Sequence, residues 1–305
     1  MTLAGGPTDE TLTRLTTEGR LPEAADLDLR STAEQVALMC AQDRQAVAAV
    51  EAAQEQLVAA IDAAAPRMRR GGRLIEVGAG TPGRLAVLDA AECRPTFGVD
   101  EGQVLGIMAG GREAMPKALE AGEDNRDAGV ADLTAVDVGP DDVVVAISAS
   151  GRTPYVRGAV TAARAAGALT IAVVNNPDSP LAREADLAVE LLTGPEVISG
   201  STRLKAGTAQ KLVLNMFSTL LMVKLGHTYG DLMVNVVAGN SKLRYRTQRI
   251  VAEACGVPLE EAAAALTTAG GDAKVAIVML KAGVNAKDAR ARLAAANGYV
   301  RAALE

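Results

Sequence analysis

Glycine and hydroxyl residues gather at two points where an apolar strand pattern gives way to a helical pattern. The first turn is Gly78-Ala79-Gly80-Thr81, and the second is Ser148-x-Ser150-Gly151-x-Thr153. Such a turn presents unpaired backbone N–H groups at a helix N-terminus, where the helix dipole also favours an anion. The hydroxyl groups add neutral donors, and no P-loop lysine follows them. One such turn is commonly only a helix cap, but two in one sheet predict a site for the phosphate monoester of a small molecule.

A second interpretation of the first turn is a dinucleotide site. Gly78-x-Gly80-x-x-Gly83 satisfies the dinucleotide fingerprint, and Asp100 lies near the expected distance for an acid that binds a ribose. A nicotinamide or flavin enzyme is therefore an alternative at this point. The hydroxyl-rich second turn is not part of that fingerprint, so it favours a phosphosugar.

The composition limits the class of protein. The chain has 305 residues, of which 49% are hydrophobic and only 2% aromatic, so the core must be aliphatic. A net charge of −6 gives no electrostatic support for a nucleic acid or an anionic membrane as partner. Three cysteines without metal-ligand spacing and a single histidine, His227, argue against a zinc centre and against a Ser-His-Asp triad. We therefore expect no metal.

No targeting or membrane segment is visible in the sequence. The start of the chain has no apolar signal region. The longest apolar stretch, 212–223, is shorter than the roughly 20 residues that a membrane helix needs. We expect a soluble, cytoplasmic protein without membrane contact.

The elements that position these turns alternate between strand and helix. Helical patterns or long connections, at 83–92, 114–121 and 154–166, separate the apolar runs. This alternation predicts a parallel sheet with helices on both faces, where ligands bind beyond the carboxyl ends of the strands. The five short apolar runs are 73–77, 104–108, 142–148, 169–174 and 187–191.

Three regions follow along the chain. Residues 1–65 form an arm and one long helix, which starts at the capping box Ser31-Thr32-Ala33-Glu34, runs to about Ala65 and is ended by Pro66 and Gly71-Gly72. Residues 66–240 form the α/β domain with the candidate site, including a long buried helix over 205–226. Residues 241–305 change to short helices punctuated by glycine, which predicts a small all-helical domain.

Longer segments identify a family. The second turn resembles the phosphate loop of sugar isomerase (SIS) domains, and the chain as a whole resembles the N-acetylmuramic acid 6-phosphate etherases. This resemblance implies a SIS-type αβα sandwich with a five-stranded parallel sheet, a homodimer, and a phosphosugar as ligand without any cofactor. The motifs that carry it are Thr17-Glu18-Gly19-Arg20, Gly78-Ala79-Gly80-Thr81, Leu88-Asp89-Ala90-Ala91-Glu92-Cys93, Ala121-Gly122-Glu123-Asp124, Ala149-Ser150-Gly151-Arg152-Thr153-Pro154-Tyr155 and Gly200-Ser201-Thr202-Arg203-Leu204-Lys205-Ala206-Gly207-Thr208.

The resemblance also implies site residues. The two acid/base carboxylates of the family match Glu92 and Glu123. Glu196 is a reserve candidate, and Arg203 is a candidate for the phosphate or the lactyl carboxylate. The sequence departs from the family at Pro82, where a serine is usual, and at Leu21, where an asparagine is usual. The residues expected to bind substrate are Gly80, Thr81, Ser148, Ser150, Gly151, Thr153 and Lys205.

The implied reaction removes D-lactate from the sugar during peptidoglycan recycling and leaves N-acetylglucosamine 6-phosphate. One carboxylate, assigned to Glu123, takes the C2 proton of the open-chain sugar. The other, Glu92, protonates the departing lactyl oxygen and then activates water. Two alternatives share the same loops: a non-catalytic sugar-phosphate-sensing regulator and an aldose–ketose phosphosugar isomerase.

Overall fold

The structure is a computed structural model that describes residues 15–117, 122–236 and 241–305. The chain divides into two compact units. The first consists of Met1–Asp89 and Leu105–Phe217, and the second of Ala90–Val104 and Ser218–Glu305.

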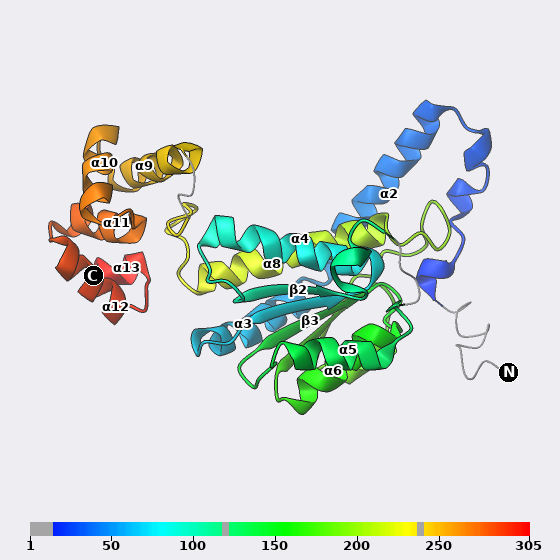
Figure 1. Ribbon diagram of the computed structural model, residues 1–305. Coiled ribbons are helices and arrows are strands. Elements are labelled where there is room, and N and C mark those ends of the chain that lie inside the picture. Colours follow the sequence, from blue (N-terminus) through cyan, green and yellow to red (C-terminus); the bar gives the residue numbers. More distant parts are fainter. Residues whose placement is uncertain (1–14, 118–121, 237–240) are drawn as a thin grey trace. The chain divides into compact units, whose positions relative to one another are not determined.

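A five-stranded sheet forms the centre of the first unit (Figure 1). Its strand order is β2-β1-β3-β4-β5, with parallel pairing from β1 to β5. All positions of β3 and β4 are buried, because helices cover both faces of the sheet. The five predicted strands are thereby confirmed. They are β1 (Leu74–Gly78), β2 (Val104–Met108), β3 (Val143–Ser148), β4 (Leu169–Val174) and β5 (Leu187–Glu190).

Helices lie on both sides of this sheet, as expected for an αβα sandwich. Figure 1 shows α5 and α6 on one side, with α4 and α8 on the other. Alternate strand residues such as Ile75 and Val144 join the core on the α6 side, together with Tyr155 and Val156. The helices of this part of the chain are α2 (Thr32–Ala52), α3 (Gln54–Arg69), α4 (Gly80–Phe97), α5 (Arg126–Ala135), α6 (Pro154–Ala165), α7 (Pro180–Glu184) and α8 (Lys205–Lys224), with short 3-10 helices at Thr16–Glu18, Pro22–Ala24, Leu27–Leu29 and Gly111–Ala114.

The predicted single helix over 31–65 is wrong in two respects. The capping box at Ser31 is present, but the helix breaks at Ala53 into α2 and α3. Pro66 does not end α3, which continues to Arg69. A proline inside a helix loses one backbone hydrogen bond, and burial of the apolar face around Ile61 and Met68 offsets that loss.

Helix α5 was not predicted, and its packing explains why. Gly129 reduces the helix propensity of this segment, but a Cβ atom there would lie 1.9 Å from the carbonyl oxygen of Tyr155. Gly158 on α6 has the same role, since its Cβ would lie 2.0 Å from the carbonyl oxygen of Arg126. The glycines therefore allow α5 and α6 to pack closely. The segment 114–121 was expected to be a helix or a long connection. Residues 115–117 are not helical and follow a 3-10 helix at Gly111–Ala114, and 118–121 lie outside the described residues.

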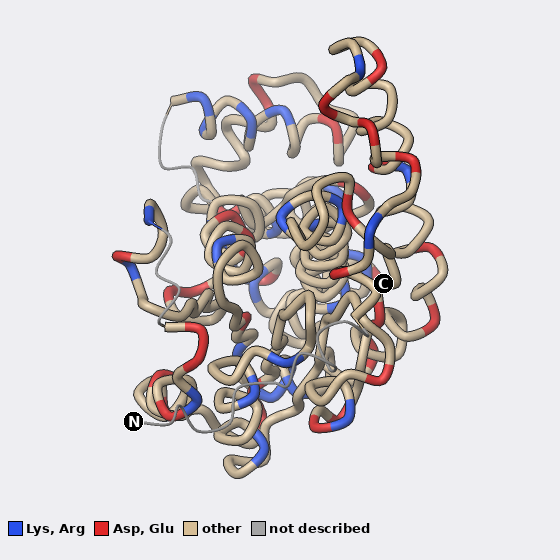
Figure 2. The backbone as a smooth tube through the Cα atoms, turned by 90° about the vertical axis from the view of Figure 1, so that its right-hand side faces the viewer, with Lys and Arg blue, Asp and Glu red and all other residues tan. Residues whose placement is uncertain are grey.

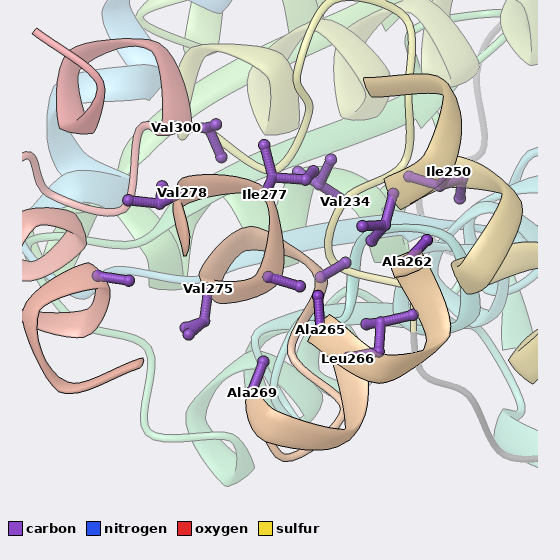
Figure 3. Packing of buried hydrophobic residues seen from close by; sticks show 14 of the residues in the cluster. Val234, Ile250, Ala262, Ala265, Leu266, Ala269, Val275, Ile277, Val278 and Val300 are labelled. Atoms are coloured by element: carbon purple, nitrogen blue, oxygen red, sulfur yellow. The ribbon is translucent and has the colours of Figure 1, made fainter. Parts of the chain in front are cut away.

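The second unit contains the predicted short helices with an aliphatic core of their own. Figure 3 shows Val234, Ile250, Ile277 and Val300 in this core. No single helix in the described ranges is long and apolar enough to cross a membrane. The helices α10 and α11 together have the length and apolar composition of a span, but the chain bends by 112° between them. The helices are α9 (Ser241–Cys255), α10 (Leu259–Thr268), α11 (Ala273–Ala282), α12 (Ala286–Ala295) and α13 (Val300–Ala303).

Candidate functional site

A cavity of about 350 Å³ lies where both predicted turns leave the sheet. Its walls come from the ends of β1 and β3, from the first turn of α4, from the N-terminal arm and from the loop before α8. The predicted phosphate-binding turns therefore meet at one site. The lining residues are Thr17, Glu18, Ala79, Gly80, Thr81, Pro82, Arg84, Glu123, Ser148, Ala149, Ser150, Thr153, Ser201, Thr202 and Arg203.

Three hydroxyl groups form a cluster on one wall of this cavity. The Oγ of Ser148 lies 2.8 Å from the Oγ1 of Thr153 and 3.4 Å from the Oγ of Ser150. The N–H of Gly151 donates to Ser148 Oγ, and the N–H of Arg152 donates to Ser150 Oγ. These bonds hold the loop in a fixed shape at the start of α6. The cluster offers neutral hydroxyl donors beside a helix N-terminus, which suits a phosphate.

The first turn is shaped by close packing of β1 on α4. A Cβ at Gly78 would lie 2.6 Å from the N of Gly83, so neither position tolerates a side chain. Gly80 adopts φ +58°, a left-handed conformation that favours glycine. Pro82 falls in the first turn of α4, where its missing N–H removes one donor and leaves those of Gly80 and Thr81.

Glu123 is positioned against this first turn. A Cβ at Gly80 would lie 2.8 Å from the Oε1 of Glu123, so the carboxylate rests directly over the glycine. The backbone of Glu123 is also fixed, because its carbonyl oxygen accepts a hydrogen bond from the N–H of Tyr155 in α6. The positive end of the α4 dipole stabilises a negative charge at this place. The arrangement places a carboxylate in the cavity beside the first turn of α4.

Glu92 lies elsewhere on α4. It is exposed and does not belong to the described residues that line the cavity. The helix is continuous, so Glu92 follows Gly80 by three turns, roughly 18 Å along the axis. One copy of α4 therefore does not present both its first turn and Glu92 to a cavity of this size.

Lys205 and Glu196 form a buried arrangement at the start of α8, outside that lining. The ammonium of Lys205 donates to Gln42 at 2.6 Å, and burial lowers its pKa. The carboxylate of Glu196 accepts from the N–H groups of Lys205 and Ala206. Burial raises the pKa of Glu196 while these bonds lower it. Both residues hold the helix start in place.

The N-terminal arm forms a wall that the sequence analysis did not assign to the site. Asn176, after β4, accepts hydrogen bonds from the N–H and hydroxyl of Thr16 and donates to the hydroxyl of Thr17. Its side chain also donates to the carbonyl of Ala149 in the loop after β3. These contacts place Glu18 on the cavity wall. The sequence motif at 17–20 could have predicted that the arm lines the cavity.

Two cations line the cavity, and they differ in their partners. Arg84 is occupied, since its guanidinium donates to the carbonyls of Ala114, Met115 and Lys117. Arg203 is exposed and makes no hydrogen bond or ion pair with any residue that the structure describes. Arg203 is therefore the cation that is available to a ligand.

A buried acid lies beneath the site. Glu76 on β1 is fully buried, and neither of its carboxyl oxygens has a hydrogen-bond partner in the described chain. Burial raises the pKa of Glu76 well above its usual value, and the adjacent Asp89 on α4 raises it further. Asp89 in turn accepts a hydrogen bond from Asn215 on α8. Glu76 therefore keeps its proton to a higher pH than an exposed glutamate does.

The described residues can be compared with the needs of a metal site and of a dinucleotide site. Within the described ranges no group of three or more His, Cys, Asp or Glu side chains could hold a metal ion. Asp100, the proposed ribose-binding acid, precedes β2, whereas ligands of such sheets bind beyond the carboxyl ends of the strands. Figure 2 shows acidic and basic residues interspersed along the chain.

Comparisons with known proteins identify the family of this chain. A model of the SIS domain matches residues 127–220, and one of the glucokinase regulatory protein N-terminal SIS domain matches 56–164. The N-acetylmuramic acid 6-phosphate etherase of Rubrobacter xylanophilus is 57% identical over 97% of this chain and 98% of its own. That of Serratia proteamaculans is 51% identical over 95% of this chain and 98% of its own. A phosphoheptose isomerase from Francisella tularensis, 15% identical, shares the fold over 64% of this chain and all of its own, with a TM-score of 0.52.

Proposed function

Because this chain belongs to the N-acetylmuramic acid 6-phosphate etherase family, we propose that its cavity is where the lactyl ether of that sugar phosphate is broken. The products are D-lactate and N-acetylglucosamine 6-phosphate, and the role is peptidoglycan recycling. The observation that carries this proposal is the carboxylate of Glu123, which faces the same cavity as the hydroxyl cluster. A phosphorylated sugar is retained inside the cell by its charge, which favours the cytoplasm as the place of action.

The 6-phosphate binds at the second turn. The hydroxyl of Ser148 lies within hydrogen-bond distance of those of Ser150 and Thr153, so one phosphate can accept from several of these groups. The first turn adds the N–H groups of Gly80 and Thr81. Gly151 contributes by its left-handed conformation, φ +62°, which shapes the loop, and Lys205 contributes by fixing the start of α8.

The proton transfers follow from the chemistry of the open-chain sugar. The C1 aldehyde makes the C2 proton acidic, and the carboxylate of Glu123 removes it. The electron pair forms the C2–C3 double bond as the C3–O bond breaks, and Glu92 protonates the departing lactyl oxygen. Water then adds to C3 while a proton returns to C2. Each positioned acid or base typically contributes on the order of 10²–10⁴-fold to the rate, and no redox cofactor is needed.

Glu92 requires a second copy of the chain in this proposal. Since one α4 does not bring Glu92 to its own cavity, the acid comes from the partner in a homodimer. Exposed apolar side chains on α8 support such an assembly: Met216, Leu220 and Val223 recur at helical spacing and are 41–45% exposed. Leu88, one turn before Glu92, is 52% exposed.

The first test measures D-lactate release from N-acetylmuramic acid 6-phosphate. We expect release, with deuterium at C2 of the sugar in D₂O and ¹⁸O from water at C3. An isomerase or a sensor would release no lactate. Label in the lactate instead of the sugar would show direct hydrolysis and contradict the elimination.

The second test concerns the shared site. Glu92→Gln and Glu123→Gln should each be inactive as purified homodimers. After subunit exchange in a mixture, half of the dimers are mixed, and each of these regains one intact site. Activity should return to about a quarter of the wild-type level. A mixture without activity, although mass analysis shows mixed dimers, would place both carboxylates in one chain. An active Glu92→Gln homodimer would remove Glu92 from the reaction.

A further inference from the structure

The cavity lining contains a cation, Arg203, that is not paired with any described residue. Arg203 lines it, is exposed, and makes no hydrogen bond or ion pair with the described chain. The other cation of the lining, Arg84, is held by three backbone carbonyls. Lys205, two residues further along, is 2% exposed and is bonded to Gln42. Of the cations near the start of α8, Arg203 alone is available to a ligand among the residues described.

The backbone that carries Arg203 is rigid. Gly200 is left-handed at φ +75°, and the N–H groups of Ser201 and Leu204 donate within the turn, to Ile198 and Ser201. The N–H of Gly207 in α8 closes the turn on the carbonyl of Thr202. The guanidinium is therefore free at the end of a side chain whose base is fixed.

The turn is also placed beside the first turn of α4. A Cβ at Gly207 would lie 3.4 Å from the Cγ2 of Thr81, so the start of α8 and the start of α4 are in contact. Arg203 thus enters the cavity from the α4 and α8 side, while the hydroxyl cluster belongs to β3 and α6. The two anion-binding features come from different walls.

The proposed substrate has two anionic groups, the 6-phosphate and the carboxylate of the lactyl ether. Neutral hydroxyl and N–H donors already serve a phosphate. A planar guanidinium matches a carboxylate with two parallel hydrogen bonds. We propose that Arg203 binds the carboxylate of the D-lactyl group, so that it selects the ether substrate over sugar phosphates that lack this group. This inference rests on the proposed function.

The experiment compares two ligands that differ only in the lactyl group. For Arg203→Gln we expect KM for N-acetylmuramic acid 6-phosphate to rise by roughly 10–100-fold, the effect of losing a charged bidentate contact. The Kd for N-acetylglucosamine 6-phosphate, measured by calorimetry, should stay within about twofold. For Arg203→Lys we expect a KM between those of the wild type and Arg203→Gln, because the positive charge remains and the two parallel hydrogen bonds of the guanidinium are lost. Lys211→Gln, an exposed site on α8 that does not line the cavity, is the control for net charge.

Each other outcome overturns the inference. A parallel loss of affinity for both ligands would make Arg203 a phosphate ligand. Unchanged constants for both would make it a solvated surface residue. Failure of the proposed function is separate, because it would appear as absent D-lactate release by the wild-type protein. The Kd values of both sugars would then be compared by calorimetry in place of KM.

Discussion

The buried carboxyl of Glu76 makes stability depend on pH in a defined direction. In the unfolded chain this group ionises near its usual value of 4.5, whereas in the folded unit burial and Asp89 raise its pKa well above that value. Between these two limits the folded state binds one more proton than the unfolded state. Stability from this group is therefore fully present below pH 4.5 and is lost as pH rises.

The size of the effect follows from the linkage relation. A difference of one bound proton changes the free energy of unfolding by about 1.4 kcal/mol per pH unit. In the pH range above 4.5 in which folded Glu76 keeps its proton, the loss of stability over two pH units is therefore about 3 kcal/mol. Glu76→Gln has nearly the same shape and no charge, so it removes this dependence.

The assay is urea unfolding followed by far-ultraviolet circular dichroism, because the chain has no tryptophan. We expect the stability of Glu76→Gln relative to wild type to increase by about 1.4 kcal/mol for each pH unit over that range. Glu113→Gln, at an exposed carboxyl, should show a constant difference. A constant difference for Glu76→Gln as well would mean that Glu76 ionises normally in the folded protein, and the reasoning would be refuted.

Two further predictions concern the cavity. Gly80→Ala should reduce lactate release at least tenfold with an unchanged circular dichroism spectrum, because the new Cβ displaces the carboxylate of Glu123 and strains a left-handed residue. The matched control is Gly102→Ala, since Gly102 is also left-handed but a Cβ there would have no neighbour within 4 Å. Equal effects of the two substitutions would argue against the contact between residue 80 and Glu123. Ser150→Ala should weaken binding of N-acetylglucosamine 6-phosphate by ~1–3 kcal/mol in calorimetry, and an unchanged affinity would place the phosphate elsewhere.

The sheet and the two turns rich in glycine and hydroxyl residues could be predicted because their signals are local. Runs such as Val143–Ser148 combine β-branched residues with a hydroxyl turn, and tertiary packing did not change that assignment. The break of the first long helix at Ala53 has no such signal, since alanine is the best helix former. At Gly129 the local signal argued against the helix α5 that is present. A glycine weakens an isolated helix, but here it is required for the close packing of α5 on α6.

The direction of a side chain is what the sequence could not reveal at the site. Lys205 and Arg203 are two residues apart and equally basic, yet one is buried on Gln42 and the other reaches the cavity. Glu76 stands in an apolar strand and is buried because its strand is covered on both faces. These differences depend on which elements meet, which is a property of the fold rather than of spacing.

The bond between Asn176 and Thr16 has a consequence for synthesis on the ribosome. The two residues are 160 positions apart, so at ~5–20 residues per second the arm waits on the order of 10–30 s for its anchor to be made. The cavity is closed later still, when Arg203 has emerged. Sugar phosphate therefore has no complete site until the whole sheet and the loop that carries Arg203 have been synthesised, and stabilisation by ligand begins only then.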